Sequence, residues 1–210
     1  MSSSERIVQF SETLRPFLPS GTEYYVAEFL IGNVVHFTIS KKRSTKLGDY
    51  RQAHDGKPHR ISVNGDLNKY AFLVTTIHEM AHLTTFDNYG NRVRSHGKEW
   101  KAEFAGLFQP LIERDLLPGD VTQAVSNYLK NAKAASCSDE RLYRVLRRYN
   151  KNKGVLVEHL EMGAIFELGG RTFELGQKLR KRYECKELKN GKTYRVLGLA
   201  EIDKEIEDEQ

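Results

Sequence analysis

The sequence has few cysteines and no long hydrophobic run. Its 210 residues include two cysteines, Cys137 and Cys185, and no CxxC pair, which excludes a disulfide framework and a four-cysteine zinc site. No apolar stretch approaches the roughly 20 residues that a membrane-spanning helix needs. The first ten residues lack the charged, apolar and small-residue order of a signal peptide. We therefore expect a cytoplasmic protein with free thiols and no membrane association.

The charge of the chain is unevenly distributed. The formal net charge is +5, but residues 201–210 carry six acidic side chains against one lysine, so residues 1–200 carry +10. A strongly basic body favours a polyanionic partner such as nucleic acid. We expect residues 204–210 to form a solvated acidic tail.

One short pattern carries chemistry. His78-Glu79-Met80-Ala81-His82 is an HExxH sequence, and apolar residues recur around it at spacings of three and four. This periodicity predicts a helix with one buried stripe. Histidines four residues apart lie on one face of a helix and can hold one metal ion, while Glu79 can reach a water in the open coordination position as a general base.

A zinc site needs a third protein ligand. A turn signal follows the first pattern, and His96 then opens a second helical run. The HExxHxxGxxH form of the motif is excluded, because it would require glycine at Thr85 and histidine at Asn88. His96 is the favoured third ligand, and a glutamate on the same helix, Glu99 or Glu103, remains the alternative.

Other residues near this pattern are interpreted structurally. His54 and His59 flank a turn sequence and are expected to be exposed loop residues rather than ligands. Lys41 to Arg51 form a basic connection, which we interpret as a solvated loop. Trp100 lies at helical spacing with apolar neighbours and is expected to anchor the core.

The segment from His78 to Phe104 reads HEMAHLTTFDNYGNRVRSHGKEWKAEF. It resembles the active-site segment of the SprT-like zinc metalloprotease family (SprT/Spartan-like). The resemblance continues upstream through Lys46 to Arg51 and Ile61 to Asn64, and it covers roughly residues 5 to 130. The chain lacks the four-cysteine zinc ribbon that many members carry at the C-terminal end. The best-studied members cleave proteins attached to DNA.

The resemblance has specific implications for this chain. It implies one Zn²⁺ ion bound by His78, His82 and His96, with Glu79 as the catalytic residue. It also implies a protein substrate that is bound or crosslinked to DNA. Tyr89, in the turn after the first helix, is a loose candidate for stabilising the oxyanion.

The expected fold is α+β, with a zincin-like metallopeptidase domain of helices and a small sheet, followed by a small antiparallel β module. Helices are expected at about 4–18 and 120–133, with a hairpin of strands 24–30 and 34–40 and a third strand at 61–63. The expected parts are a metallopeptidase domain at 1–135, a basic helix and linker at 136–153, a β module at 154–203 and the tail at 204–210.

The last third of the chain contains a second basic region. An amphipathic helix is expected over 138–153, and its exposed cations are candidate contacts to nucleic acid, the alternative being an ordinary solvated face. These cations are Arg141, Arg144, Arg147, Arg148 and Lys151. Five strands are expected in the β module, at 155–160, 164–168, 171–175, 179–188 and 193–202. Tyr183 and Tyr194 are expected to pack rather than to stack on bases.

These observations predict a zinc-dependent metalloendopeptidase of the HExxH type that acts on DNA-associated or DNA-crosslinked proteins. The alternative is a non-catalytic, nucleic-acid-associated module in which zinc is structural. Glu79 favours the enzyme, because a purely structural site has no use for a carboxylate at that position. A general peptidase without DNA dependence is a third hypothesis.

Overall fold

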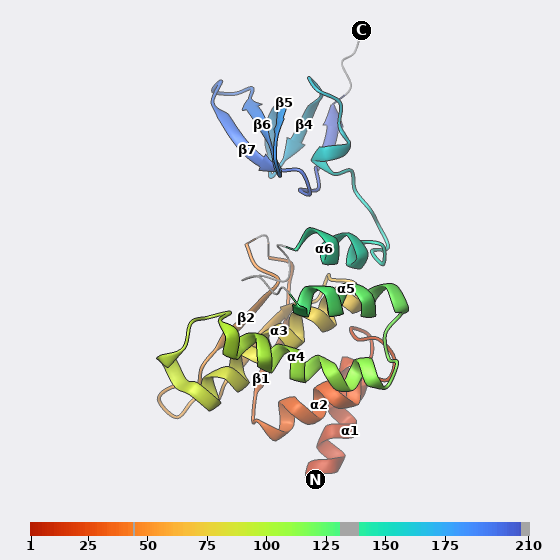
Figure 1. The fold of residues 1–210 in the computed structure, drawn as a ribbon, viewed down its shortest axis with the longest axis vertical. Helices are drawn as coiled ribbons and strands as arrows, with labels where there is room; N and C mark the ends of the chain where they lie inside the picture. The colour runs from red at the N-terminus through yellow and green to blue at the C-terminus, as the bar shows by residue number, and fades with distance from the viewer. Residues whose placement is uncertain (44, 131–138, 207–210) are drawn as a thin grey trace. The chain divides into compact units, whose positions relative to one another are not determined.

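The structure is a computed structural model that describes residues 1–43, 45–130 and 139–206. The chain divides into two compact units, Met1–Lys151 and Asn152–Gln210, which are called the first and second unit below. The first unit mixes helices with a small sheet, and the second is a separate antiparallel sheet (Figure 1). None of the described helices is long and apolar enough to cross a membrane. Cys137 and the expected helix end at 131–133 lie outside the described residues.

Six α-helices of the first unit are described, together with one short 3₁₀ helix, η1. Their bounds are α1 Ser3–Leu14, α2 Glu23–Gly32, α3 Lys69–Tyr89, η1 Gly90–Arg92, α4 Lys98–Glu113, α5 Gly119–Lys130 and α6 Glu140–Arg147. Ser2 caps α1 in a reciprocal capping box with Glu5. The HExxH pattern lies in α3, as its periodicity predicted, and α4 confirms the second helical run.

The sheet of the first unit contains three strands, β1 His36–Ser40, β2 Gly48–Arg51 and β3 Arg60–Asn64. Their order is β1-β3-β2, with β1 parallel and β2 antiparallel to β3. The prediction of a strand at 61–63 is confirmed. The predicted hairpin of 24–30 with 34–40 is wrong, because residues 24–30 belong to α2. Val26, Ala27 and Leu30 are buried at helical spacing, and α2 packs against α1.

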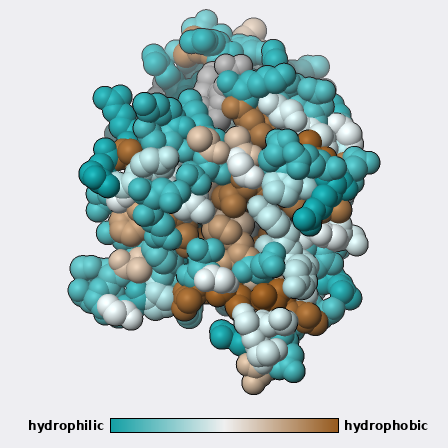
Figure 2. All heavy atoms as spheres, turned by 60° about the horizontal axis from the view of Figure 1, so that its bottom comes forward, coloured by the Kyte–Doolittle hydropathy of each residue, from teal (hydrophilic) through white to brown (hydrophobic). Residues whose placement is uncertain are grey.

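The helix α3 lies at the centre of the first unit. Twelve of its residues are buried, and it packs against α4 on one side and against β2 and β3 on another. Trp100 on α4 has no exposed surface and stacks on Phe104, with the ring centroids 4.9 Å apart, which confirms its expected place in the core. The face drawn in Figure 2 is hydrophilic over most of its area, with hydrophobic side chains gathered in its middle and lower part.

The second unit contains a five-stranded antiparallel sheet in the order β7-β6-β5-β4-β8. Its strands are β4 Ile165–Leu168, β5 Arg171–Leu179, β6 Arg182–Glu187, β7 Thr193–Leu197 and β8 Lys204–Ile206. Two expectations are wrong here. Residues 155–160 contain a 3₁₀ helix, Val157–His159, and the segment expected as a tail begins with β8, which pairs with β4. Tyr183 and Tyr194 pack against the apolar core, as expected.

Candidate metal centre

The helix α3 presents two of the candidate ligands. Asn68 caps its N-terminus by accepting hydrogen bonds from the backbone N–H groups of Tyr70 and Ala71, so the helix has a fixed start. His78 and His82 are one turn apart, and their Nε2 atoms are 3.2 Å from each other. The pattern therefore places both rings on the same face.

The third histidine approaches from the segment that leads into α4. His96 has a backbone φ of 58°, in the left-handed region that is uncommon for residues other than glycine, although histidine is among those found there more often. Gly97 caps α4, and its N–H donates to the carbonyl of Arg94 at 2.9 Å. A Cβ at Gly97 would lie 2.9 Å from that oxygen, so glycine permits this tight turn. The turn directs the His96 ring toward α3.

The three histidines converge on one point. His96 Nε2 is 3.0 Å from His78 Nε2, and one nitrogen from each of the three rings lies within 4.8 Å of the others. A tetrahedral zinc ion at about 2.0–2.1 Å from each nitrogen would separate the nitrogens by roughly 3.3 Å, close to the observed distances. A cation between the rings would accept all three lone pairs at once. The donor set therefore fits a metal ion of the zinc type.

An aromatic wall supports the three rings. The indole of Trp100 lies 4.6 Å from the His78 ring, 4.7 Å from the His96 ring and 5.5 Å from the His82 ring, measured between centroids. Because Trp100 is fully buried and stacked on Phe104, it limits the rotation of the histidines. Ser95 Oγ lies 3.3 Å from His96 Nδ1, within reach of a hydrogen bond that would orient this ring.

Burial keeps the histidines neutral. It lowers the pKa of His78 to about 3, helped by repulsion from His82 and His96, and lowers the pKa of His82 to about 4, helped by His96. The pKa of His96 is also lowered by burial. Neutral imidazole is the form that binds metal, so the three side chains are ready to coordinate at neutral pH.

Glu79 lies against the strand β2. It is 7% exposed, and the backbone N–H of Tyr50 donates a hydrogen bond to it. A Cβ at Gly48 would overlap Glu79 Oε1 and would lie 2.7 Å from Thr75 Cγ2, so only glycine fits there. Burial, with a contribution from Asp49, raises the pKa of Glu79 to about 8. The fold thus holds a carboxyl group beside the histidines in a confined position.

A hydrogen-bonded chain of three side chains flanks His82. The Tyr50 ring stacks on the His82 ring with the centroids 6.2 Å apart, and the Tyr50 hydroxyl lies 2.9 Å from His59 Nδ1. The same Nδ1 accepts the N–H of Ala53, so His59 carries its proton on Nε2, which lies 3.4 Å from Asp87 Oδ1. Burial raises the pKa of Tyr50, which keeps the hydroxyl protonated.

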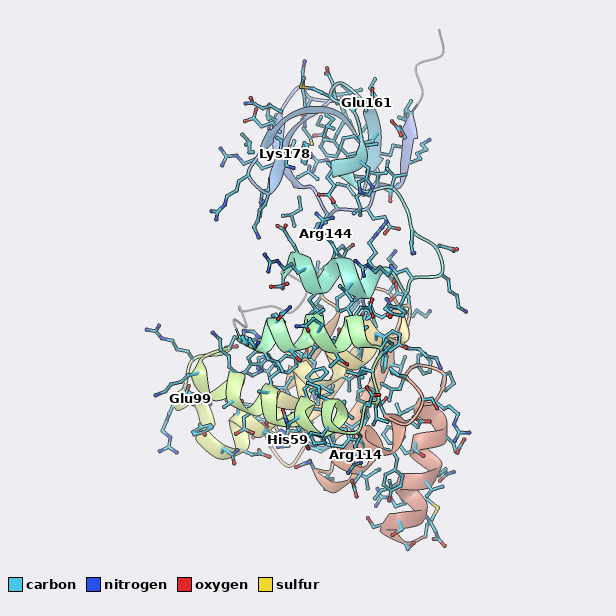
Figure 3. The ribbon with its side chains drawn as sticks, turned by 45° about the vertical axis from the view of Figure 1, so that its right-hand side comes forward. His59, Glu99, Arg114, Arg144, Glu161 and Lys178 are labelled. Atoms are coloured by element: carbon cyan, nitrogen blue, oxygen red, sulfur yellow. The ribbon has the colours of Figure 1, made fainter. Side chains whose placement is uncertain are left out.

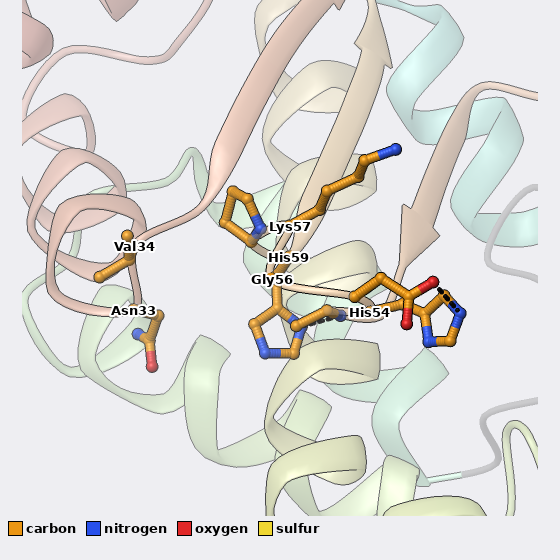
Figure 4. A pocket seen from close by; sticks show the side chains of 9 residues that line it. Asn33, Val34, His54, Gly56, Lys57 and His59 are labelled. Carbon is orange, nitrogen blue, oxygen red and sulfur yellow. Dashed lines mark hydrogen bonds and ion pairs between the residues drawn. The ribbon is translucent and has the colours of Figure 1, made fainter.

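His59 was expected to be an exposed loop residue, and this expectation is wrong. Its side chain is 14% exposed and also contacts the Phe86 ring. His59 lies at the edge of an open hollow of about 600 Å³ between the end of α2 and the connection from β2 to β3 (Figure 4). His54 on the same connection is exposed, as expected, and pairs with Asp55 at 3.0 Å.

The glutamates weighed as a third ligand lie elsewhere. Glu103 Oε1 accepts a hydrogen bond from Asn88, and Glu99 lies 3.8 Å from Lys98. Within the described ranges, the three-residue group that could hold a metal is made of histidines alone. Tyr89 is half-buried at the end of α3, and it is Tyr50 that contacts a ligand ring, that of His82. The alternation of side chains along β2 could have indicated Tyr50. Its side chain points to the same side of the strand as Gly48, which lies against Glu79.

The basic helix is partly engaged within the first unit. Arg148 lies 3.4 Å from Asp120 on α5, and the Tyr149 hydroxyl donates to the same carboxylate at 2.6 Å. Arg147 is half-buried, whereas Arg141 and Lys151 are exposed. Arg144 is also exposed, on the side of α6 that faces away from α5 (Figure 3). The helix itself is shorter than expected, since it ends at Arg147.

Comparison with known proteins gives one family. Residues 21–111 match the model of the SprT-like family. This range contains β1 to β3, α3, most of α4 and the three converging histidines. No curated protein and no solved structure gives a significant match to the chain.

Proposed function

Residues 21–111 of this chain belong to the SprT-like family, and from that premise we propose that the protein is a zinc-dependent metalloendopeptidase with a zincin-like catalytic domain. Its substrates are proteins bound or crosslinked to DNA. The observation that carries the proposal is the convergence of His78, His82 and His96 beside a confined carboxyl group, Glu79. Metal ligands alone would suit a structural site, and the adjacent carboxyl group favours catalysis.

The chemistry follows from the residues around the centre. A zinc ion on the three histidines would polarise the scissile carbonyl and lower the pKa of an attacking water. A divalent cation also favours the ionised form of Glu79, whose pKa is raised by burial without one. Glu79 then takes the proton of the water and delivers it to the leaving amine. The N–H of Tyr50 fixes the carboxylate for both transfers.

The edge strand β2 supports an extended substrate. It pairs with β3 on one side, its inner face at Gly48 lies against Glu79, and the backbone N–H of Tyr50 donates to that carboxylate. An extended peptide that adds to this edge would pass Glu79 with its backbone aligned. Such alignment suits cleavage within a chain rather than at its end.

The charge distribution supports an association with DNA. The exposed cations Arg141, Arg144 and Lys151 lie on or just after α6, and residues 1–200 carry a net charge of +10. Phosphate contacts of this kind would bring the catalytic centre to proteins on DNA without regard to base sequence.

The decisive experiment compares wild type with Glu79→Gln after metal analysis of both. Each is incubated with a DNA-binding protein, with and without DNA. We expect equal zinc content, and DNA-stimulated cleavage by wild type only, reduced in the variant by on the order of a thousandfold or more.

The other outcomes separate the hypotheses. Zinc-loaded wild type that cleaves none of several DNA-binding proteins would favour a non-catalytic module. Cleavage that requires Glu79 but not DNA would favour a general peptidase.

A further inference from the structure

The outer face of the three-stranded sheet is polar throughout. Alternate residues of each strand point to opposite sides, so Phe37, Ile61 and Tyr50 face the core of the first unit. The residues between them form the outer face, and the register arranges these in rows across the strands. One row is His36, Arg60 and Arg51, and the next is Thr38, Ser62 and Asp49.

The first row places like charges side by side. Arg60 on the central strand is directly opposite His36 on one side and Arg51 on the other. Like charges directly opposite each other destabilise a sheet. Arg60 is exposed, and no acidic side chain in the described part of the chain forms an ion pair with it. An anion between the arginines would remove this repulsion.

Further cations adjoin the second row. Arg43, expected in a solvated loop, is half-buried and donates to Asn64 Oδ1 at 2.7 Å and to Ser62 Oγ at 3.0 Å. These acceptors are neutral, so the hydrogen bonds add no counter-charge to the guanidinium. Asp49 is the single carboxylate, and it is already bound by Lys46 at 2.8 Å and Arg51 at 3.1 Å.

These side chains line a concavity of about 450 Å³ on the sheet face. Four cations, Arg43, Lys46, Arg51 and Arg60, surround it against one carboxylate. Hydroxyl groups of Thr38 and Ser62 lie between them. Arginine forks and hydroxyl donors are the groups that bind phosphate oxygens in protein–DNA complexes.

We propose that this outer face, centred on Arg51 and Arg60, binds the phosphodiester backbone of nucleic acid. A nucleic acid fits better than an acidic protein, because a protein interface has an apolar centre and this face has none. Binding is independent of base sequence, since phosphate contacts carry no information about the bases. The proposal does not depend on peptidase activity, and it assigns nucleic-acid contact to a surface other than α6.

The test measures binding of a fluorescent oligonucleotide, single- or double-stranded, by anisotropy. All proteins are full-length and carry Glu79→Gln, so that cleavage does not interfere. The variant is Arg51→Gln/Arg60→Gln. The matched control is Arg6→Gln/Arg114→Gln, which removes two charges from exposed positions elsewhere in the first unit. Arg144→Gln/Arg148→Gln tests α6.

We expect the Arg51/Arg60 variant to bind about tenfold more weakly or worse at low salt. Its slope of log affinity against log salt should fall by roughly two, one for each lost phosphate contact. The control should change affinity less than about twofold. Thermal melting checks that all variants are folded.

Three results would overturn the proposal. The Arg51/Arg60 variant could bind as wild type does, with the loss confined to the α6 variant. The control could weaken binding as much, which would indicate a general charge effect. Poly-glutamate could bind as tightly as the oligonucleotide and compete with it, which would indicate docking of an acidic protein.

Discussion

The two faces of the three-stranded sheet are built from alternate residues of the same strands, yet they have opposite chemistry. The inner face presents Gly48 and Tyr50 to Glu79 and His82, in a buried environment that raises the pKa of Glu79 and lowers the pKa of His82. The outer face presents Arg51 and Arg60 to solvent. Because successive side chains of a strand point to opposite faces, one sheet carries a candidate catalytic centre on its inner face and a candidate polyanion site on its outer face.

Acid should distinguish the faces most strongly, because the groups with the largest pKa shifts are on the inner side. In protein stripped of metal, the lowered pKa values of His78 and His82 mean that the unfolded state binds more protons below about pH 6.5. The neutral histidines therefore stabilise the folded state above pH 6.5, and this contribution is lost as the pH falls toward 4. We expect a loss on the order of 3 kcal/mol in the free energy of unfolding.

Glu79 should produce the opposite trend. Its raised pKa, about 8, means that the folded state keeps a proton that the unfolded state releases, so stability falls between pH 4.5 and 8. Metal-free wild type should be most stable near pH 6, and metal-free Glu79→Gln should lose the alkaline decline and gain stability more steeply between pH 4.5 and 6.5. Urea unfolding across this pH range measures both. A Glu79→Gln curve that is flat between pH 4.5 and 6.5 would contradict the assignment to the histidines.

The second prediction alters the inner face alone. Gly48→Ala places a methyl group against Glu79 and Thr75, which displaces the carboxylate. We expect cleavage to fall about a hundredfold, as misplacement of a catalytic group by about 1 Å does, while zinc content and oligonucleotide affinity stay unchanged. Gly106→Ala is the control, because a Cβ there meets nothing within 4 Å. Equal activity of both variants would show that β2 does not position Glu79.

Sequence reasoning located the centre better than its surroundings. Local spacing on α3 indicated His78 and His82, and the family resemblance indicated His96, which the left-handed backbone turns toward them. The sequence of α2 predicts a strand, because its tyrosines, valine and phenylalanine favour strands. The segment instead forms a helix, which is stabilised by packing against α1. The strand β8 was missed because charged residues conceal its pairing with β4.

The contact between Tyr50 and His59 could not be predicted from the sequence, for a different reason. Their contact depends on the connection between β2 and β3, which returns His59 beside Tyr50, and on Asp87 near the end of α3. No motif or period joins these three positions. The parallel pairing of β1 with β3 is equally invisible from the sequence, since it depends on a crossover through β2.

The third prediction tests whether this hydrogen-bonded chain positions the inner face. Tyr50→Phe keeps the ring on His82 but removes the hydroxyl that binds His59, and His59→Gln removes the link to Asp87. We expect each to lower zinc affinity or kcat by about tenfold, in the range found for groups that support metal ligands. Competition with a chromogenic chelator measures the affinity. Values equal to those of wild type in both assays would reduce the chain to a packing role.

The smallest effect is expected on the outer face. Arg60→Gln removes the like-charge contact with Arg51, so the free energy of unfolding should rise by roughly 0.2–1 kcal/mol at low salt. High salt should abolish the gain, because screening already weakens the repulsion in wild type. Zinc content and cleavage of a DNA-free peptide should not change, since the substituted side chain points away from Glu79. Urea unfolding at two salt concentrations, with Arg6→Gln as the control, measures the difference. Destabilisation by Arg60→Gln at low salt would mean that Arg60 has a structural partner, and the separation of the two faces would then need another explanation.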